Sequence, residues 1–208
     1  MIVDQTGFTF TFGGLNPGAP YDVFVFGGDV INDVDNIVTI TGQTTVGPFT
    51  QNSNNGDIVI NRQVTSAAPL DSFAEVVLAN ASGEIVITTN GTTGTTVIDG
   101  LAIRESVSAP PVAQDELIGV DFSRQGTTSP TNWTRAEGNS DFSLTNLIDE
   151  TGATTNVGLD IRFDGGTATG QGTFPSGDPA DLPTHSNPLT GIGGVIVDQS
   201  GILSLIHI

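Results

Sequence analysis

The sequence predicts an all-β protein built as an antiparallel β-sandwich, and three observations carry that prediction. Segments in which apolar and polar residues alternate follow one another through the first half of the chain, as half-buried strands require. Turn-forming residues separate them, and the chain contains 27 glycines and 11 prolines. No segment of helical length is rich in Ala, Leu, Glu and Lys, so helices are not expected.

The first half of the chain is expected to hold most of the strands. The segment TGFTFTFGGL alternates strictly and places Phe8, Phe10 and Phe12 on one face. After the turn NPGAP, YDVFVFGG is apolar on both faces apart from Asp22, which predicts a central strand covered on both sides. Strands are also expected in NIVTITGQTT, GDIVINRQ and TTVIDGLAIRES. FAEVVLANASGEIVITTNG is expected to form a hairpin that turns at residues 81–83.

A linker and a second group of strands follow. Residues 108–116 contain adjacent prolines and small residues, which is typical of a linker. LIGVDFS predicts a new strand, and FSLTNLIDETG predicts either a strand or one helical turn. VGLDIRFDGG alternates, so that Leu159, Ile161 and Phe163 are expected to face inward. A long loop rich in glycine and proline comes after it.

The net charge limits the classes of molecule that the chain is expected to bind. The chain has 23 acidic residues and five basic ones, and its net charge is −18. Phosphate backbones and anionic lipids would repel such a chain, so neither nucleic acid nor membrane insertion is expected. The carboxylates suit either solubility in a salty medium or the binding of calcium. The absence of cysteine excludes disulfides and thiolate chemistry.

Two nearly identical segments lie far apart in the sequence. Residues 195–201, VIVDQSG, match residues 1–7, MIVDQTG, at five of seven positions. A tandem repeat with a period close to the length of the chain explains the match. Residues 117–202 would then be the N-terminal half of one repeat, and residues 1–107 the C-terminal half of the preceding one. Residues 203–208, LSLIHI, resemble the translation of a transposon end used in sequencing libraries, and are expected to be non-biological.

This interpretation makes the chain a metagenomic fragment and has consequences for its fold and location. The two halves are expected to be able to pair across the linker as one circularly permuted sandwich, because the termini of such domains often lie close together. The two IVDQ segments would then compete for one strand position. The absence of a signal peptide would carry no information.

Three motifs give the repeat a recognisable order. They are Val120-Asp121-Phe122, the run from Leu15 to Gly18 followed by Tyr21, Val23 and Val25, and the stretch from Gly83 to Ile103. In that order the chain resembles the galactose-binding-like jelly-roll modules that are repeated in secreted bacterial multidomain proteins. The resemblance covers most of the chain. It implies a jelly roll, a non-catalytic carbohydrate-binding role, an extracellular or cell-surface location, and neighbouring repeats of the same chain as partners.

One candidate ligand site surrounds the single tryptophan. Trp133 lies in the segment SPTNWTR, next to Asn132 and close to Arg135. An indole face can stack on a sugar ring while amide and guanidinium groups bind the hydroxyls, which makes these three residues the predicted contacts of an extracellular glycan. The alternative is that Trp133 caps the core of the sandwich. Tyr21 is expected to lie in the core.

The candidate metal site is the acidic segment GGDVINDVDN. Closely spaced carboxylates and amides can surround calcium, which would act as a structural cofactor. The alternative is a solvated acidic loop. The predicted metal ligands are Asp29, Asp33, Asp35 and Asn36, and a weaker second cluster consists of Asp160, Asp164, Asp178 and Asp181.

No catalytic residue is predicted, and the protein is not expected to be an enzyme. Ser140, Asp181 and His185 contain the right groups for a hydrolytic triad, but the chain lacks a nucleophile elbow and a parallel α/β sheet. Weak glycan binding strengthened by repetition is the first functional hypothesis. A structural stalk or adhesin repeat without a ligand is the second, and an accessory domain of a polysaccharide-degrading enzyme is the third. An exposed Trp133 would favour the first hypothesis, and a buried one the second.

Overall fold

In the described residues, a computed structural model of the chain shows strands joined by turns and one short 3-10 helix, η1 (Leu70–Phe73). The structure describes residues 2–4, 6–27, 34–53, 59–64, 70–92, 96–106, 117–122, 131–136, 141–163, 195–198 and 202–205. The strands are β1 (Ile2–Asp4), β2 (Phe8–Gly13), β3 (Pro20–Gly27), β4 (Val34–Thr41), β5 (Thr45–Ser53), β6 (Val59–Ile60), β7 (Gln63–Val64), β8 (Glu75–Leu78), β9 (Ile85–Gly91), β10 (Thr96–Glu105), β11 (Ile118–Phe122), β12 (Thr134–Ala136), β13 (Phe142–Leu144), β14 (Gly158–Phe163), β15 (Val195–Asp198) and β16 (Ile202–Leu205).

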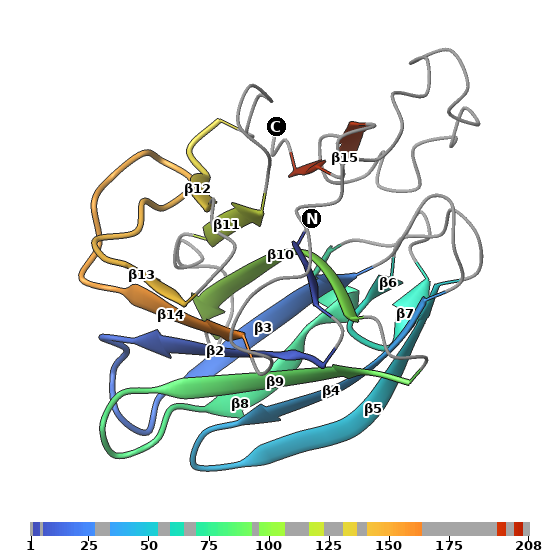
Figure 1. Ribbon diagram of the computed structural model, residues 1–208. Coiled ribbons are helices and arrows are strands. Elements are labelled where there is room, and N and C mark those ends of the chain that lie inside the picture. The colour runs from blue at the N-terminus through green and yellow to red at the C-terminus, as the bar shows by residue number, and fades with distance from the viewer. Residues whose placement is uncertain are drawn as a thin grey trace.

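Two sheets face each other across a common core (Figure 1). The first sheet has eight strands in the order β12-β11-β10-β3-β6-β7, with β1 also beside β10 and β8 also beside β3. The second sheet has six strands in the order β13-β14-β2-β9-β4-β5. Among the described strands only β11 and β12 pair in parallel. The predicted all-β antiparallel sandwich is therefore confirmed, whereas its assignment to the jelly rolls stays a prediction.

Strands from both sides of the predicted linker contribute to both sheets. In the first sheet β11 pairs with β10, from Gly100↔Asp121 to Ile103↔Ile118. In the second sheet β14 pairs with β2 along its whole length. The linker itself, residues 108–116, lies outside the described residues. Described strands from both halves thus belong to one sandwich, and the assignment of the halves to successive repeats stays a prediction.

Alternating strands supply the core of the sandwich, as predicted. Phe8, Phe10 and Phe12 of β2 are fully buried, while the threonines between them are half-exposed. In β14, Leu159, Ile161 and Phe163 face the same core. The rings of Phe8 and Phe163 meet edge-on, with centroids 5.0 Å apart. Such a contact adds about 0.5–1.5 kcal/mol to the burial of the two rings.

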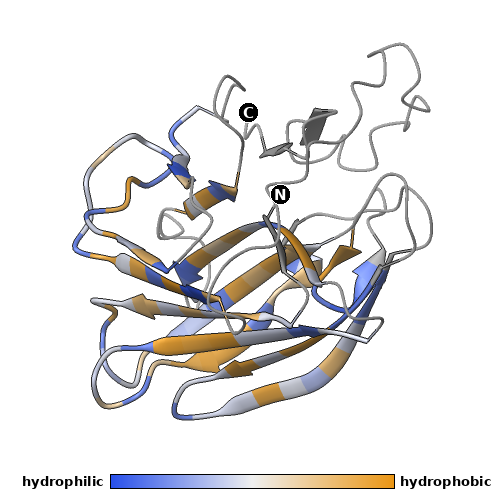
Figure 2. Cartoon of the chain, viewed as in Figure 1, coloured by the Kyte–Doolittle hydropathy of each residue, from blue (hydrophilic) through white to orange (hydrophobic). Residues whose placement is uncertain are grey.

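The central strand β3 is covered on both faces, which confirms the prediction from its apolar sequence. Val23 and Val25 face the core between the sheets. Phe24 and Phe26 point to the opposite, outward face, and both are also fully buried. Figure 2 shows apolar residues along strands of both layers. The outward face of the first sheet is therefore buried at β3, whereas Val76 of the neighbouring β8 is 53% exposed.

The connection from β2 to β3, which crosses from the second sheet to the first, is held by Tyr21. Its ring is buried in the core, as predicted. Its hydroxyl accepts a hydrogen bond from the backbone N–H of Asn16 at 2.9 Å and donates to Glu105 at 3.2 Å. A tyrosine bonded to the backbone a few residues upstream is a recurrent corner of β-sandwiches. Tyr21 therefore fixes the geometry of the crossing.

The predicted hairpin at residues 73–91 is wrong. β8 pairs with β3 in the first sheet, whereas β9 pairs with β2 and β4 in the second. The turn between them is closed by a hydrogen bond from Asn80 N–H to Glu84 C=O at 2.9 Å. It carries the chain from the first sheet to the second, and Val77 of β8 and Ile87 of β9 are both buried in the common core.

Candidate functional site

Trp133, the centre of the predicted glycan site, is buried, with 7% of its surface exposed. It immediately precedes β12 and lies against the outward face of the first sheet. A Cβ atom added to Gly119 would lie 2.3 Å from its ring atoms Cδ2 and Cε2. The ring of Phe26 packs against it at 57°, with centroids 6.1 Å apart. The indole therefore offers no open face on which a sugar ring would stack.

Small residues make room for this indole. In β10 and β11, Leu101 and Val120 point into the core. Gly100 is adjacent to Leu101, and Gly119 is adjacent to Val120. Because side chains alternate along a strand, these two glycines present their backbone to the outward face. An added Cβ at Gly100 would also contact the indole, at 3.8 Å from Cζ3. Trp133 thus packs on the outward face of the first sheet, rather than capping the core between the sheets.

Asn132 holds a neighbouring loop. Its backbone is in the left-handed region, with φ of 62°. Its side-chain amide donates to the carbonyl of Glu150 at 2.8 Å. In the same loop the buried Asp149 accepts hydrogen bonds from the N–H groups of Thr151 and Ala153, both at 2.9 Å. The amide that was predicted to contact a glycan therefore joins residues 131–134 to the loop at 146–157.

Arg135 is the third predicted glycan contact and belongs to β12. Its backbone lies opposite Asp121 of β11 in the parallel register. Asp121 is buried, with 1% of its surface exposed, and Arg135 is half-buried. Opposite charges on adjacent strands attract each other. Because β12 and the residues before it carry all three predicted contacts, the structure brings Trp133, Asn132 and Arg135 together beside β11.

The acidic segment is described only in part. Asp29 and Asp33 lie outside the described residues, so the calcium hypothesis stays a prediction. Asp35 is half-exposed in β4, and its carboxylate accepts a hydrogen bond from the Asn52 amide at 2.6 Å. Of the weaker cluster, only Asp160 belongs to the described residues, and its Oδ2 lies 3.7 Å from Nη2 of Arg162. The other proposed residues outside the described part are Asp164, Asp178 and Asp181, together with Ser140 and His185 of the rejected triad.

Asn36 has a structural partner in the opposite sheet. Its Oδ1 accepts from the N–H of Val97 at 3.1 Å, and its Nδ2 donates to the carbonyl of Val97 at 2.8 Å. These are the two bonds that a neighbouring strand would make with that residue. At this point β3 has ended at Gly27, where an added Cβ would lie 2.9 Å from Asn36 Nδ2. The side chain of Asn36 therefore completes the hydrogen bonding of β10 where β3 stops.

Two further buried amides act in the same way. Asn61 accepts from the N–H of Val25 at 3.0 Å and donates to the carbonyls of Val23 and Phe73, both at 2.7 Å. Gln51 donates to the carbonyl of Val25 at 2.8 Å and accepts from Asn36 at 3.3 Å. We refer to Asn36, Gln51 and Asn61 as the amide cluster. Each member satisfies backbone groups that would be costly to bury unpaired.

The sequence contains a signal for the burial of one member of this cluster. In NIVTI the alternation that places Val38 and Ile40 in the core also places Asn36 there. A polar residue at an inward position has to find hydrogen-bond partners inside the protein. The signal indicates burial of Asn36, but the sequence does not indicate which backbone it would meet.

A charged cluster ties η1 to the first sheet. Arg104 of β10 donates to Asp22 of β3 at 2.8 Å and to Asp71 of η1 at 2.6 Å, and its guanidinium lies 5.8 Å from the ring centre of Phe24. Burial lowers the pKa of Arg104, but its hydrogen bonds to Asp22 and Asp71 raise it, and the pKa is raised overall. Arg104 is therefore firmly charged at neutral pH.

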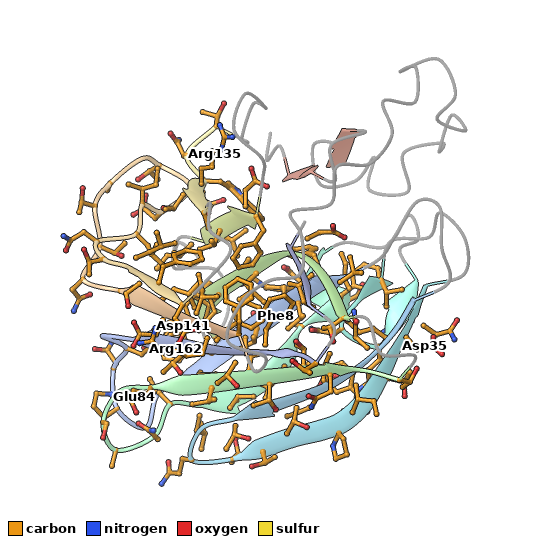
Figure 3. The ribbon with its side chains drawn as sticks, viewed as in Figure 1. Phe8, Asp35, Glu84, Arg135, Asp141 and Arg162 are labelled. Carbon is orange, nitrogen blue, oxygen red and sulfur yellow. The ribbon has the colours of Figure 1, made fainter. Side chains whose placement is uncertain are left out.

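Described members of the two predicted ligand sites lie far apart. Figure 3 places Arg135 on β12 far from Asp35 on β4. Among the described side chains, no group of three or more His, Asp or Glu residues could hold a metal ion. In the same part of the chain, no helix is long and apolar enough to cross a membrane.

Comparison of the chain with protein-family models, with curated proteins and with solved structures finds no match.

Proposed function

We propose that this chain is a non-catalytic β-sandwich module that spaces neighbouring modules of a secreted or cell-surface bacterial repeat protein. The burial of Trp133 against Gly119 and Phe26 carries the proposal. A sugar-binding indole has to be exposed, and this one forms part of the packing of the first sheet. The proposal gives the module a scaffolding role and no ligand of its own.

The internal use of the other candidate ligand groups also supports a scaffolding role. The Asn132 amide is bonded to Glu150, and the Asn36 amide to Val97 and Gln51. Binding a ligand through either amide would break bonds that hold two segments together. Breaking such bonds leaves buried backbone groups unsatisfied, at about 1–3 kcal/mol for each group. Rigid connections of this kind suit a module that holds its neighbours at a fixed separation.

Carbohydrate binding is the second candidate function, and Arg135 is the residue that favours it. Arg135 is half-buried in β12 at the edge of the first sheet, where its backbone lies opposite the buried Asp121. A planar guanidinium can donate to the hydroxyls of a sugar. A site built on Arg135 alone would bind weakly, and repetition along a parent chain would then supply the avidity.

Glycan-array titration of the full chain, in calcium and in a chelator, separates the two functions. For a spacer we expect no glycan response and the same melting temperature with and without calcium. Arg135→Ala and Arg162→Ala are matched variants, because Arg162 lies on the second sheet. A glycan response that Arg135→Ala abolishes and Arg162→Ala retains would overturn the spacer proposal. A rise in melting temperature with calcium would instead assign a cation to the acidic segment.

A further inference from the structure

The strand β10 offers one short position that β1 fills. Ile98 pairs with Gly27 of β3 and also with Ile2 of β1, so β1 lies on the side of β10 away from β3. On that same side β11 pairs with Gly100 and the three residues that follow. The position of β1 is therefore limited to the start of β10, with the register Ile2↔Ile98, Val3↔Val97 and Asp4↔Thr96.

This position is formed by contacts that do not involve β1. The N–H and C=O of Val97 are both bonded to the side chain of Asn36, on the side where β3 has ended. Because strand residues point their backbone groups to alternate sides, those of Thr96 and Ile98 point toward β1. Asn36, itself bonded to Gln51, thus holds the start of β10 on the side where β3 has ended, and the opposite edge of β10 is the one that pairs with β1.

A second segment of the chain has the sequence of β1. Residues 196–199 repeat residues 2–5 without a change, and a glycine follows two positions later in both, at Gly7 and Gly201. Gly7 has φ of 146°, and a Cβ there would lie 2.2 Å from the carbonyl oxygen of Thr89, so a glycine is required. The repetition therefore preserves the one position of the segment at which the structure shows a steric demand.

We propose that the position beside β10 accepts residues 195–198 of a second copy of this chain in place of β1. The register would be Ile196↔Ile98, Val197↔Val97 and Asp198↔Thr96, as for β1. In its own chain β15 pairs with β16 and with no other strand among the described residues. The exchange joins the end of one copy to the first sheet of the next, by adding a strand to a sheet edge.

A three-residue ladder is short, so the exchange between separate chains is weak and depends on concentration. Covalent connection of neighbouring copies would raise the effective concentration into the millimolar range. The inference concerns strand pairing only. It holds whether the module is a spacer or binds a glycan, and its tests measure association between chains rather than ligand binding.

A labelled peptide of residues 194–201 tests the exchange directly. The acceptor is the chain carrying Asp4→Pro and Asp198→Pro, because proline removes the N–H that pairs with Thr96 in both segments. The control acceptor carries Asp198→Pro alone and keeps β1. By fluorescence anisotropy we expect the peptide to bind the double variant at least about tenfold more tightly than the control. Equal binding to both acceptors, or binding to neither, would overturn the proposal.

A crosslinking experiment does not depend on the folding of a proline variant. The chain has no cysteine, so single substitutions give defined disulfides. Residues opposite each other in a non-hydrogen-bonded antiparallel pair have Cα atoms about 4.5 Å apart, within disulfide reach. A Val97→Cys chain mixed with a Val197→Cys chain is expected to give a mixed dimer under mild oxidation. If Thr88→Cys, on the second sheet, gives as much mixed dimer as Val197→Cys, the proposal is wrong.

Discussion

The outward faces of the two sheets differ in what covers them, although the strands of both have the same inward pattern. On the first sheet Phe24, Phe26 and Ala102 point outward and are fully buried, and Trp133 packs over this face. On the second sheet the outward residues of β2 and β9 include Thr9 and Thr88, which are half-exposed. Both sheets contribute fully buried residues to the common core, so the difference lies mainly in the outer surfaces.

This difference shows which sequence feature indicates that both faces of a sheet are buried. β2 alternates strictly, and only one of its faces is apolar. β3 is apolar at consecutive positions, and β10 combines apolar residues with outward small residues such as Gly100 and Ala102. Consecutive apolar residues indicate a strand buried on both faces. Small outward residues indicate, in addition, that something bulky packs there.

Trp133→Ala is expected to have the largest effect on stability among the variants that test this comparison. It removes the largest side chain described on the covered face and leaves a cavity over Gly119 and Phe26. The free energy of unfolding is expected to fall by about 3–5 kcal/mol. Because Trp133 is the only tryptophan, unfolding should be followed by circular dichroism in a denaturant titration.

Thr88→Ala is the matched control on the open face. It is expected to change the stability by no more than about 0.5 kcal/mol. Loss of stability below about 1 kcal/mol for Trp133→Ala would contradict its role as a packing residue. The spacer proposal would then lose its main support.

Gly119→Ala tests the same contact from the other side. The added methyl group would lie 2.3 Å from the indole, so the ring or the strand has to move. Overpacking of this kind is expected to cost about 1–3 kcal/mol. In a Trp133→Ala background the clash is absent, and Gly119→Ala should be nearly neutral there. A double-mutant cycle measured by denaturation gives this coupling, and additive effects would show that the two positions do not interact.

The strands differ in how well they could be predicted from the sequence. The strands β2, β3, β11 and β14 could be predicted because their patterns are local. β5 was missed because Gly47 and Pro48 interrupt its pattern, although the strand lies at the edge of its sheet, where proline is tolerated. The fold class followed from local patterns, whereas the pairing of β8 and β9 in different sheets depended on the whole core.

The candidate site was less predictable, because its decisive contacts are distant in sequence. Trp133 was correctly singled out as unusual, but its burial depends on a parallel pairing between β11 and β12. Asn36 was proposed as a metal ligand, and its partner Val97 lies 61 residues away. The residue types that bind sugars and cations also satisfy buried backbone groups. Composition and spacing alone did not distinguish the two uses.

A pair of arginine variants gives an intermediate effect and compares the two faces with the same substitution. Arg104→Met removes the partner of the half-buried Asp22, and the expected loss is about 1–3 kcal/mol. Arg162→Met, on the second sheet, removes contacts of 3.7 and 3.9 Å between exposed groups, and the expected loss is about 0–1 kcal/mol. Both losses are measured by denaturation at low and at high salt.

The salt and pH dependence of the stability losses distinguishes these two variants further. Screening should remove the small effect of Arg162→Met and preserve most of the effect of Arg104→Met. The folded-state pKa of Arg104 is raised, so its contribution is fully present below its unfolded pKa and is lost only as the pH rises through the folded value. The difference between wild type and Arg104→Met should therefore be constant from pH 7 to pH 9. A difference that declined over this range would contradict the assignment.

The smallest expected effect belongs to Thr88→Val on the open face. Thr88 stands between Thr9 and Thr39 in the register of the second sheet, and its side chain is half-exposed. Valine keeps the branched shape that suits a strand, and water satisfies the lost hydroxyl's neighbours, so stability should change by no more than about 0.5 kcal/mol. Ala102→Thr places a hydroxyl on the covered face instead, and should cost about 1–3 kcal/mol through overpacking. Equal effects of the two substitutions in denaturation would show that both outward faces are packed to the same degree, and the contrast between the faces would not hold.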